Sequence, residues 1–131
     1  MDATGTFVVE MTPAPAAPTD QSTVGHMLLS KTYSGDIAGT GEGHMLMVRT
    51  ATKGSAGYVA IEKVAATLAG KSGTFLLQHH GIMDRGTPSL TVSVVPDSAN
   101  GELLGLSGTM TIENSDGNHH YTFNYDLPAL P

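Results

Sequence analysis

The sequence predicts an all-β fold: a single domain over residues 1–131, built as a small antiparallel β-barrel of about eight strands. Sixteen glycines interrupt the chain so often that no long helix fits between them. Between these turn signals, short segments alternate apolar and polar residues, which is typical of β-strands. An open sheet of that many strands would expose two edges, and this favours closure into a barrel. A two-sheet sandwich is the alternative.

The first half of the chain contains four expected strands. Residues 6–11 alternate, and residues 12–18 then contain three prolines, which predict a polyproline-like loop because proline has no N–H to donate. Residues 24–33 end at a Ser-Gly-Asp turn, and residues 43–50 end at a glycine-containing turn. Residues 58–68 fit either a helix or a strand, and their β-rich neighbours favour a strand.

The second half contains four more expected strands. Residues 74–83 follow a turn at 69–73, and residues 90–95 follow a turn at 84–88. The loop 96–101 leads into the strand 102–113. The last strand, 118–127, follows an Asp-Gly pair, which is the strongest short hairpin signal. Regular spacing and tight turns predict that these strands form a meander.

Composition excludes several classes of function. The chain has no cysteine, so disulfides, thiolate metal sites and cysteine nucleophiles are excluded. Its net charge of −6 and its lack of a basic cluster argue against binding to nucleic acid or to an anionic membrane surface. No signal peptide and no membrane-spanning apolar run are visible, so we expect a cytoplasmic protein.

Alternation assigns side chains to the two faces of each strand. In residues 58–68, one face carries Lys63, and because lysine is rarely buried we expect the opposite face to point inward. The expected inward sets are Tyr58, Ala60, Glu62 and Val64 in this strand; Phe75, Leu77, His79 and Met83 in residues 74–83; and Tyr121, Phe123, Tyr125 and Leu127 in the last strand.

Several short segments stand out in combination, namely GEG at 41–43, GSAGYVAIE at 54–62, SGTFLLQH at 72–79, VVPDS at 94–98, GEL at 101–103, GTM at 108–110 and HYTFNYDLP at 120–128. Together they resemble a bacterial domain-of-unknown-function family, number 3224 (DUF3224), over nearly the whole chain. Its members look like the allene oxide cyclase and dirigent barrels. The resemblance implies an allene oxide cyclase-like barrel of eight strands that often forms small homo-oligomers. It implies no reaction, because the family has no established activity and no catalytic residue of the plant cyclases is matched here.

Glu62 and His79 are the candidate catalytic pair. If both point into the barrel, a carboxylate and an imidazole face an apolar interior. Desolvation would then raise the pKa of Glu62, and the histidine would orient it or pair with its charge, as in general acid–base catalysis. The alternative is a structural hydrogen bond between neighbouring strands, because buried polar groups need partners.

Five further residues are candidates for binding a ligand. Tyr58 and Tyr121 can present phenol groups at a barrel mouth, although such tyrosines are more often core rings with one wet end. Glu42, between two glycines, caps a strand end or reaches the cavity mouth. Phe123 and Tyr125 are expected to line the interior.

Arg49 shares a strand face with Met45 and Met47. This pattern fits an anion-binding arginine above an apolar wall, or an outward salt bridge.

We expect neither a metal nor a cofactor. Among the six histidines are the pairs His79-His80 and His119-His120, and the two members of a pair on a strand point to opposite faces. One histidine from each pair converging with Glu62 or Glu102 is the alternative, but no spacing matches a known ligand motif.

Three functions stay open on this reading. The first is binding of a small apolar ligand inside the barrel, which the methionine content favours slightly because methionine adapts to varied shapes. The second is an isomerase or cyclase that uses Glu62 and His79. The third is a structural or interaction protein with a filled barrel.

Overall fold

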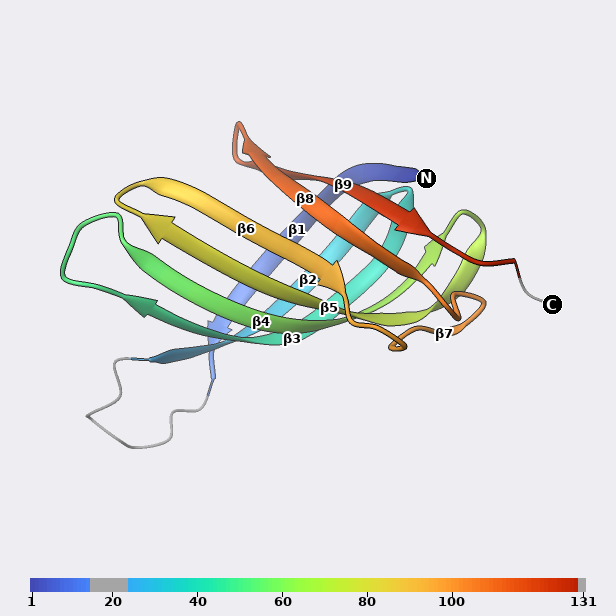
Figure 1. Ribbon diagram of the computed structural model, residues 1–131, viewed down its shortest axis with the longest axis horizontal. Coiled ribbons are helices and arrows are strands. Elements are labelled where there is room, and N and C mark those ends of the chain that lie inside the picture. Colours follow the sequence, from blue (N-terminus) through green and yellow to red (C-terminus); the bar gives the residue numbers. More distant parts are fainter. Residues whose placement is uncertain (15–23, 130–131) are drawn as a thin grey trace.

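The chain folds into a closed antiparallel β-barrel (Figure 1), and the computed structural model describes residues 1–14 and 24–129. No helix in these residues is long and apolar enough to cross a membrane. The strands are β1 (Asp2–Pro13), β2 (Gly25–Gly35), β3 (Ile37–Arg49), β4 (Ala56–Leu68), β5 (Lys71–Asp84), β6 (Thr87–Val94), β7 (Asn100–Gly101), β8 (Ser107–Ser115) and β9 (Asn118–Asp126).

The barrel is a meander of eight strands. The strands from β1 to β6 each pair with the next, β6 pairs with β8, β8 with β9, and β9 returns to β1 and closes the barrel. The two-residue strand β7 is an addition that pairs with the start of β5. The predicted eight-stranded antiparallel barrel is therefore confirmed, and the sandwich alternative is wrong.

Most expected strands are present, but several begin or end at other residues than the sequence predicted. Residues 58–68 lie within the strand β4. β1 continues to Pro13, which pairs with Met27 at the last position of the ladder, where a missing N–H interrupts little. The rest of the expected polyproline-like loop, residues 15–18, lies outside the described residues.

The expectation of a strand from residue 102 is wrong. Residues 102–105 form a turn, in which the Leu103 N–H donates to the Asn100 carbonyl, and Leu103 and Leu106 are buried. The strand β8 begins only at Ser107. Two buried leucines three residues apart anchor this turn to the core, and strand periodicity does not detect such an anchor.

The core fills one half of the barrel. Most of the inward side chains of β5 and β9 expected from alternation are buried there, with Phe75, Phe123 and Tyr125 in a stacked series, whereas Met83 is 38% exposed and Leu127 only partly buried. Ring centroids in this series lie 6.0 and 5.4 Å apart. Ile37 and Leu68 close this half beside the β2–β3 and β4–β5 turns.

Inward glycines make room for large side chains on neighbouring strands. A Cβ on Gly81 would lie 2.1 Å from the Tyr58 ring, and a Cβ on Gly5 would lie 2.4 Å from the Tyr121 hydroxyl. Small and large residues therefore alternate across the interior, as closely packed small barrels require.

Candidate functional site

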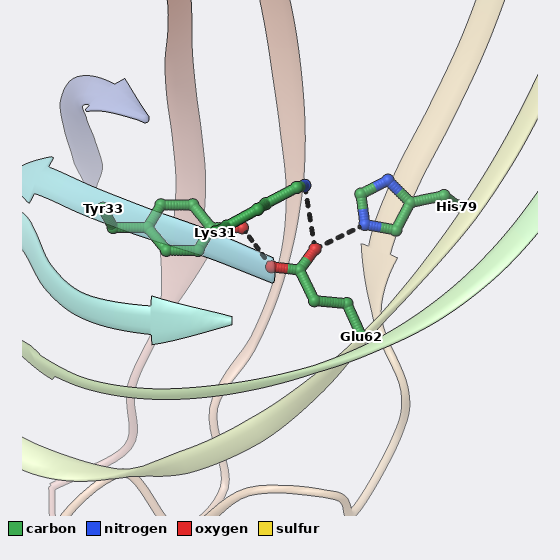
Figure 2. A network of polar contacts seen from close by, with 4 residues as sticks. All are labelled: Lys31, Tyr33, Glu62 and His79. Carbon is green, nitrogen blue, oxygen red and sulfur yellow. Dashed lines mark hydrogen bonds and ion pairs between the residues drawn. The ribbon is translucent and has the colours of Figure 1, made fainter. Parts of the chain in front are cut away.

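A buried polar network crosses the middle of the barrel, and Figure 2 shows three side chains converging on the carboxylate of Glu62. Lys31 Nζ donates to Glu62 Oε1 over 2.9 Å, and the Tyr33 hydroxyl donates to Oε2 over 2.5 Å. His79 Nε2 lies 2.8 Å from Oε1. Glu62 has no exposed surface, while Lys31 is 6% and His79 3% exposed. The expected pair of Glu62 and His79 thus exists, as part of a set of four.

Lys31 and Tyr33 reach Glu62 across the strand that separates them. Both lie on β2 and Glu62 lies on β4, with β3 between. The inward positions of β3 at this level are glycines, and a Cβ on Gly41 would lie 2.1 Å from Glu62 Oε2 and 3.1 Å from the Tyr33 ring. The absence of side chains on β3 therefore creates the space in which the network forms.

Sequence reasoning missed Lys31 because lysine is rarely buried. The usable signal is alternation, since Lys31 shares a face with Leu29 and Tyr33. Its ammonium group also lies 4.6 Å from the centroid of the Phe7 ring, a cation–π distance. A buried cation with a carboxylate and an aromatic face as neighbours satisfies the requirement that buried charges be paired.

The network lowers the pKa of Glu62, contrary to the expectation that it would be raised. Burial alone would raise this pKa, but the hydrogen bond with His79 and the charge of Lys31, with the Tyr33 hydroxyl, bring it from 4.5 to about 2. The pKa of Tyr33 moves well above its ordinary value, because of burial and then the adjacent Glu62 carboxylate. Glu62 is therefore a stable anion, and a general acid at neutral pH would need the opposite shift.

A pocket of about 620 Å³ opens at the other end of the barrel from the packed core, where the β3–β4 and β5–β6 hairpins project together (Figure 1). Its walls carry inward side chains of β3, β4, β5 and β6. They include Met45, Met47, Tyr58, Met83 and Leu90. Met83 and Leu90 are 38% and 39% exposed, so the apolar wall faces solvent.

The polar network does not line this pocket. Along the aligned strands, Met47 and Tyr58 form one inward level, and Met45, Ala60 and His79 form the next. Glu62 follows one level deeper. Met45 and Tyr58 line the pocket, while neither His79 nor Glu62 does.

Of the five expected ligand-binding residues, Tyr58 alone lines this pocket. Burial raises the pKa of its phenol. Phe123 and Tyr125 point inward, as alternation predicted, but they belong to the packed core at the opposite end.

Tyr121 also has a structural place. Its hydroxyl accepts a hydrogen bond from the Ile37 N–H over 2.9 Å and donates to the Ser34 carbonyl over 3.0 Å, and so fixes the β2–β3 turn. Its pKa is raised, first by burial.

Glu42 lies away from the pocket, contrary to expectation. It lies exposed on the outer face of β3, in register with Lys63 of β4. Because Gly41 and Gly43 occupy the two inward positions beside it, the residue between them must point outward. It does not reach the cavity mouth.

The histidines do not gather around an ion site. Within residues 1–14 and 24–129, three or more His, Asp or Glu side chains do not converge in a geometry that could hold a metal ion. His79 is buried and His80 exposed, as the alternation of a strand requires. Outside the barrel, His26 Nε2 and His44 Nδ1 lie 3.0 Å apart on β2 and β3, and this pair is exposed.

The outer face of the barrel carries a group of exposed apolar side chains on β3, β4 and β5. Leu46, Val59, Ile61 and Ile82 are between 45% and 49% exposed and lie on neighbouring strands. We call these four residues the outer apolar face. Apolar side chains clustered in this way often mark a contact surface.

Comparison with known proteins places the chain in a family. The family model described as "Protein of unknown function (DUF3224)" matches residues 3–125. A crystal structure of a protein with unknown function from the DUF3224 family of Shewanella oneidensis MR-1 is 45% identical, with a TM-score of 0.91. The match covers 99% of this chain and 98% of that one. A search of curated proteins finds no match. The chain belongs to the DUF3224 family, as the sequence resemblance indicated.

Proposed function

We propose that this protein binds a small apolar molecule in the pocket at the open end of the barrel. The observation that carries the proposal is the pocket itself, about 620 Å³ and walled by Met45, Met47, Tyr58, Met83 and Leu90. This volume is within the range of ligand sites, which are typically apolar with few polar groups. Methionine side chains adapt to ligands of different shapes.

The alternatives have less support. An isomerase or cyclase would need Glu62 and His79 in contact with the substrate, but both are buried and neither lines the pocket. The depressed pKa of Glu62 also makes it a weak base. A filled barrel accounts for the core half of the interior and leaves the open half unexplained.

Binding can be tested with N-phenyl-1-naphthylamine, a neutral dye that fluoresces in apolar surroundings. The purified protein should bind it saturably. In Met47→Trp, the larger ring would occupy part of the pocket and displace the dye from its wall. Binding should weaken about tenfold, because losing about 55 Å² of apolar contact between the dye and the wall costs about 1.4 kcal/mol. Leu46→Trp is the matched control, because Leu46 precedes Met47 on β3 and points outward.

The two variants separate the pocket from the outer apolar face. Equal weakening by both variants, or a dye signal that does not saturate, would overturn the proposal. Far-ultraviolet circular dichroism should show the same β-sheet spectrum for both variants and the parent protein.

We further propose that two copies associate through the outer apolar face. Support comes from Leu46, Val59, Ile61 and Ile82, which lie on three adjacent strands and are about half exposed. Joining two such faces would remove this apolar surface from water.

A further inference from the structure

The rim of the pocket carries positive charge and no negative charge. Arg49 ends β3, and Lys53 lies in the turn that follows; both line the pocket, and none of the other lining residues is Asp or Glu. The chain as a whole has twelve acidic and six basic residues, so acidic side chains are twice as frequent. A third of the lysines and arginines therefore face a pocket that contains no acid.

Neither cation is neutralised by another residue of the described part of the chain. Arg49 and Lys53 form no ion pair and no side-chain hydrogen bond with the residues that the structure describes. The nearest turn does contain an acid, Asp84, but this residue is 3.9 Å from Arg85 and does not line the pocket. The guanidinium and ammonium groups at the rim remain available to a ligand.

The turn that carries Lys53 is held in place. Within it, the Thr50 N–H donates to the Ser55 carbonyl over 3.1 Å. It is also tied to the β5–β6 turn, because the Gly86 N–H donates to the Gly54 carbonyl over 3.0 Å and the Arg85 N–H donates to Ser55 Oγ over 3.1 Å. Two hairpins thus fix the rim before any ligand arrives, and this lowers the entropy cost of binding.

From this arrangement we infer that the ligand is an amphiphile with one anionic head group, bound with its apolar body against the methionine wall and its charge at Arg49 and Lys53. The inference rests on the proposed binding function and specifies the class of ligand. Arginine recognises carboxylate, sulfonate and phosphate oxygens in a bidentate manner. A neutral apolar molecule would leave both cations unused.

Two dyes with one skeleton test the charge. 1-Anilinonaphthalene-8-sulfonate carries a sulfonate, and N-phenyl-1-naphthylamine lacks it. Arg49→Gln and Lys53→Gln should each weaken binding of the sulfonate about two- to fivefold, the range of a partly solvated ion pair. Binding of the neutral dye should stay within about twofold, because no charged group contacts it. Raising the salt to about 1 M should remove most of the difference, because the screening length falls to about 3 Å.

Lys63→Gln is the matched control. It removes one positive charge from the outer face of β4, so all three variants change the net charge from −6 by the same amount. Equal weakening of the sulfonate by Lys63→Gln, or no weakening by the two rim variants, would overturn the anionic inference while saturable binding of the neutral dye upholds the pocket. If neither dye binds saturably, the proposed function fails and the inference falls with it.

Discussion

Replacing Glu62 with Gln tests whether the buried network contributes to stability as the structure requires. The substitution keeps the size of the side chain and removes its charge, and it leaves the Lys31 ammonium buried without a counterion. Breaking a buried ion pair on one side costs about 3–5 kcal/mol. The pKa leads to a similar figure, since a fall from 4.5 to about 2 corresponds to about 3 kcal/mol at 1.36 kcal/mol for each pH unit.

The pH dependence follows from the direction of that shift. The folded protein holds Glu62 ionised at pH values where the unfolded chain protonates it, so the stabilisation is present above pH 4.5 and is lost as the pH falls toward 2. The difference in unfolding free energy between the parent protein and Glu62→Gln should be about 3 kcal/mol at pH 7. It should shrink to about 1 kcal/mol at pH 2.5.

Urea unfolding at several pH values measures this difference directly. Glu10→Gln, an exposed carboxylate on β1, is the control and should cost less than about 0.5 kcal/mol. Lys31→Met combined with Glu62→Gln should recover part of the loss, because both charges are then absent. A Glu62→Gln cost below about 1 kcal/mol at pH 7, or one that does not change with pH, would refute the reasoning.

Three further substitutions test the close contact at Gly41, the hydrogen bond from the Ile37 N–H to the Tyr121 hydroxyl, and the outer apolar face. Gly41→Ala should destabilise by about 1–3 kcal/mol in urea unfolding, because its Cβ would lie 2.1 Å from Glu62 Oε2; a neutral effect would contradict the close contact. Tyr121→Phe should cost about 1–3 kcal/mol by the same assay, since the Ile37 N–H loses its partner, and an unchanged midpoint would count against that bond. Ile61→Lys should shift the protein toward monomer in light scattering at micromolar concentration, and a parent protein that is already monomeric would refute self-association.

Much of the fold is predictable because a strand has a period of two. Tyr121, Phe123 and Tyr125 alternate with polar residues over a stretch long enough to assign the inward face, and the structure buries all three. The same logic places Glu62 and His79 inside. Alternation reports direction only, so it cannot say which part of the interior is packed and which is open. For that reason three of the five expected ligand-binding residues, Tyr121, Phe123 and Tyr125, point inward but do not line the pocket.

The contacts of Lys31 and Tyr33 with Glu62 join strands that are not neighbours. Lys31 reaches Glu62 across β3, and base rates for buried lysine argue against this from the sequence. The sequence signal is Gly41-Glu42-Gly43, because its two inward glycines leave β3 without side chains at the level where those of β2 and β4 need space. A pattern that leaves space on one strand becomes informative only when the register of all three is known.

The network also explains how an open pocket and a packed core coexist in one barrel. Lys31, Tyr33, Glu62 and His79 form a layer between the two halves, and among the described residues no buried side-chain nitrogen or oxygen lacks a hydrogen-bond partner. Because every polar group in the layer is satisfied internally, it needs neither a ligand nor water from the pocket to remain buried. The packed half can therefore keep its structure whether the open half is occupied or empty, as the proposed binding function requires.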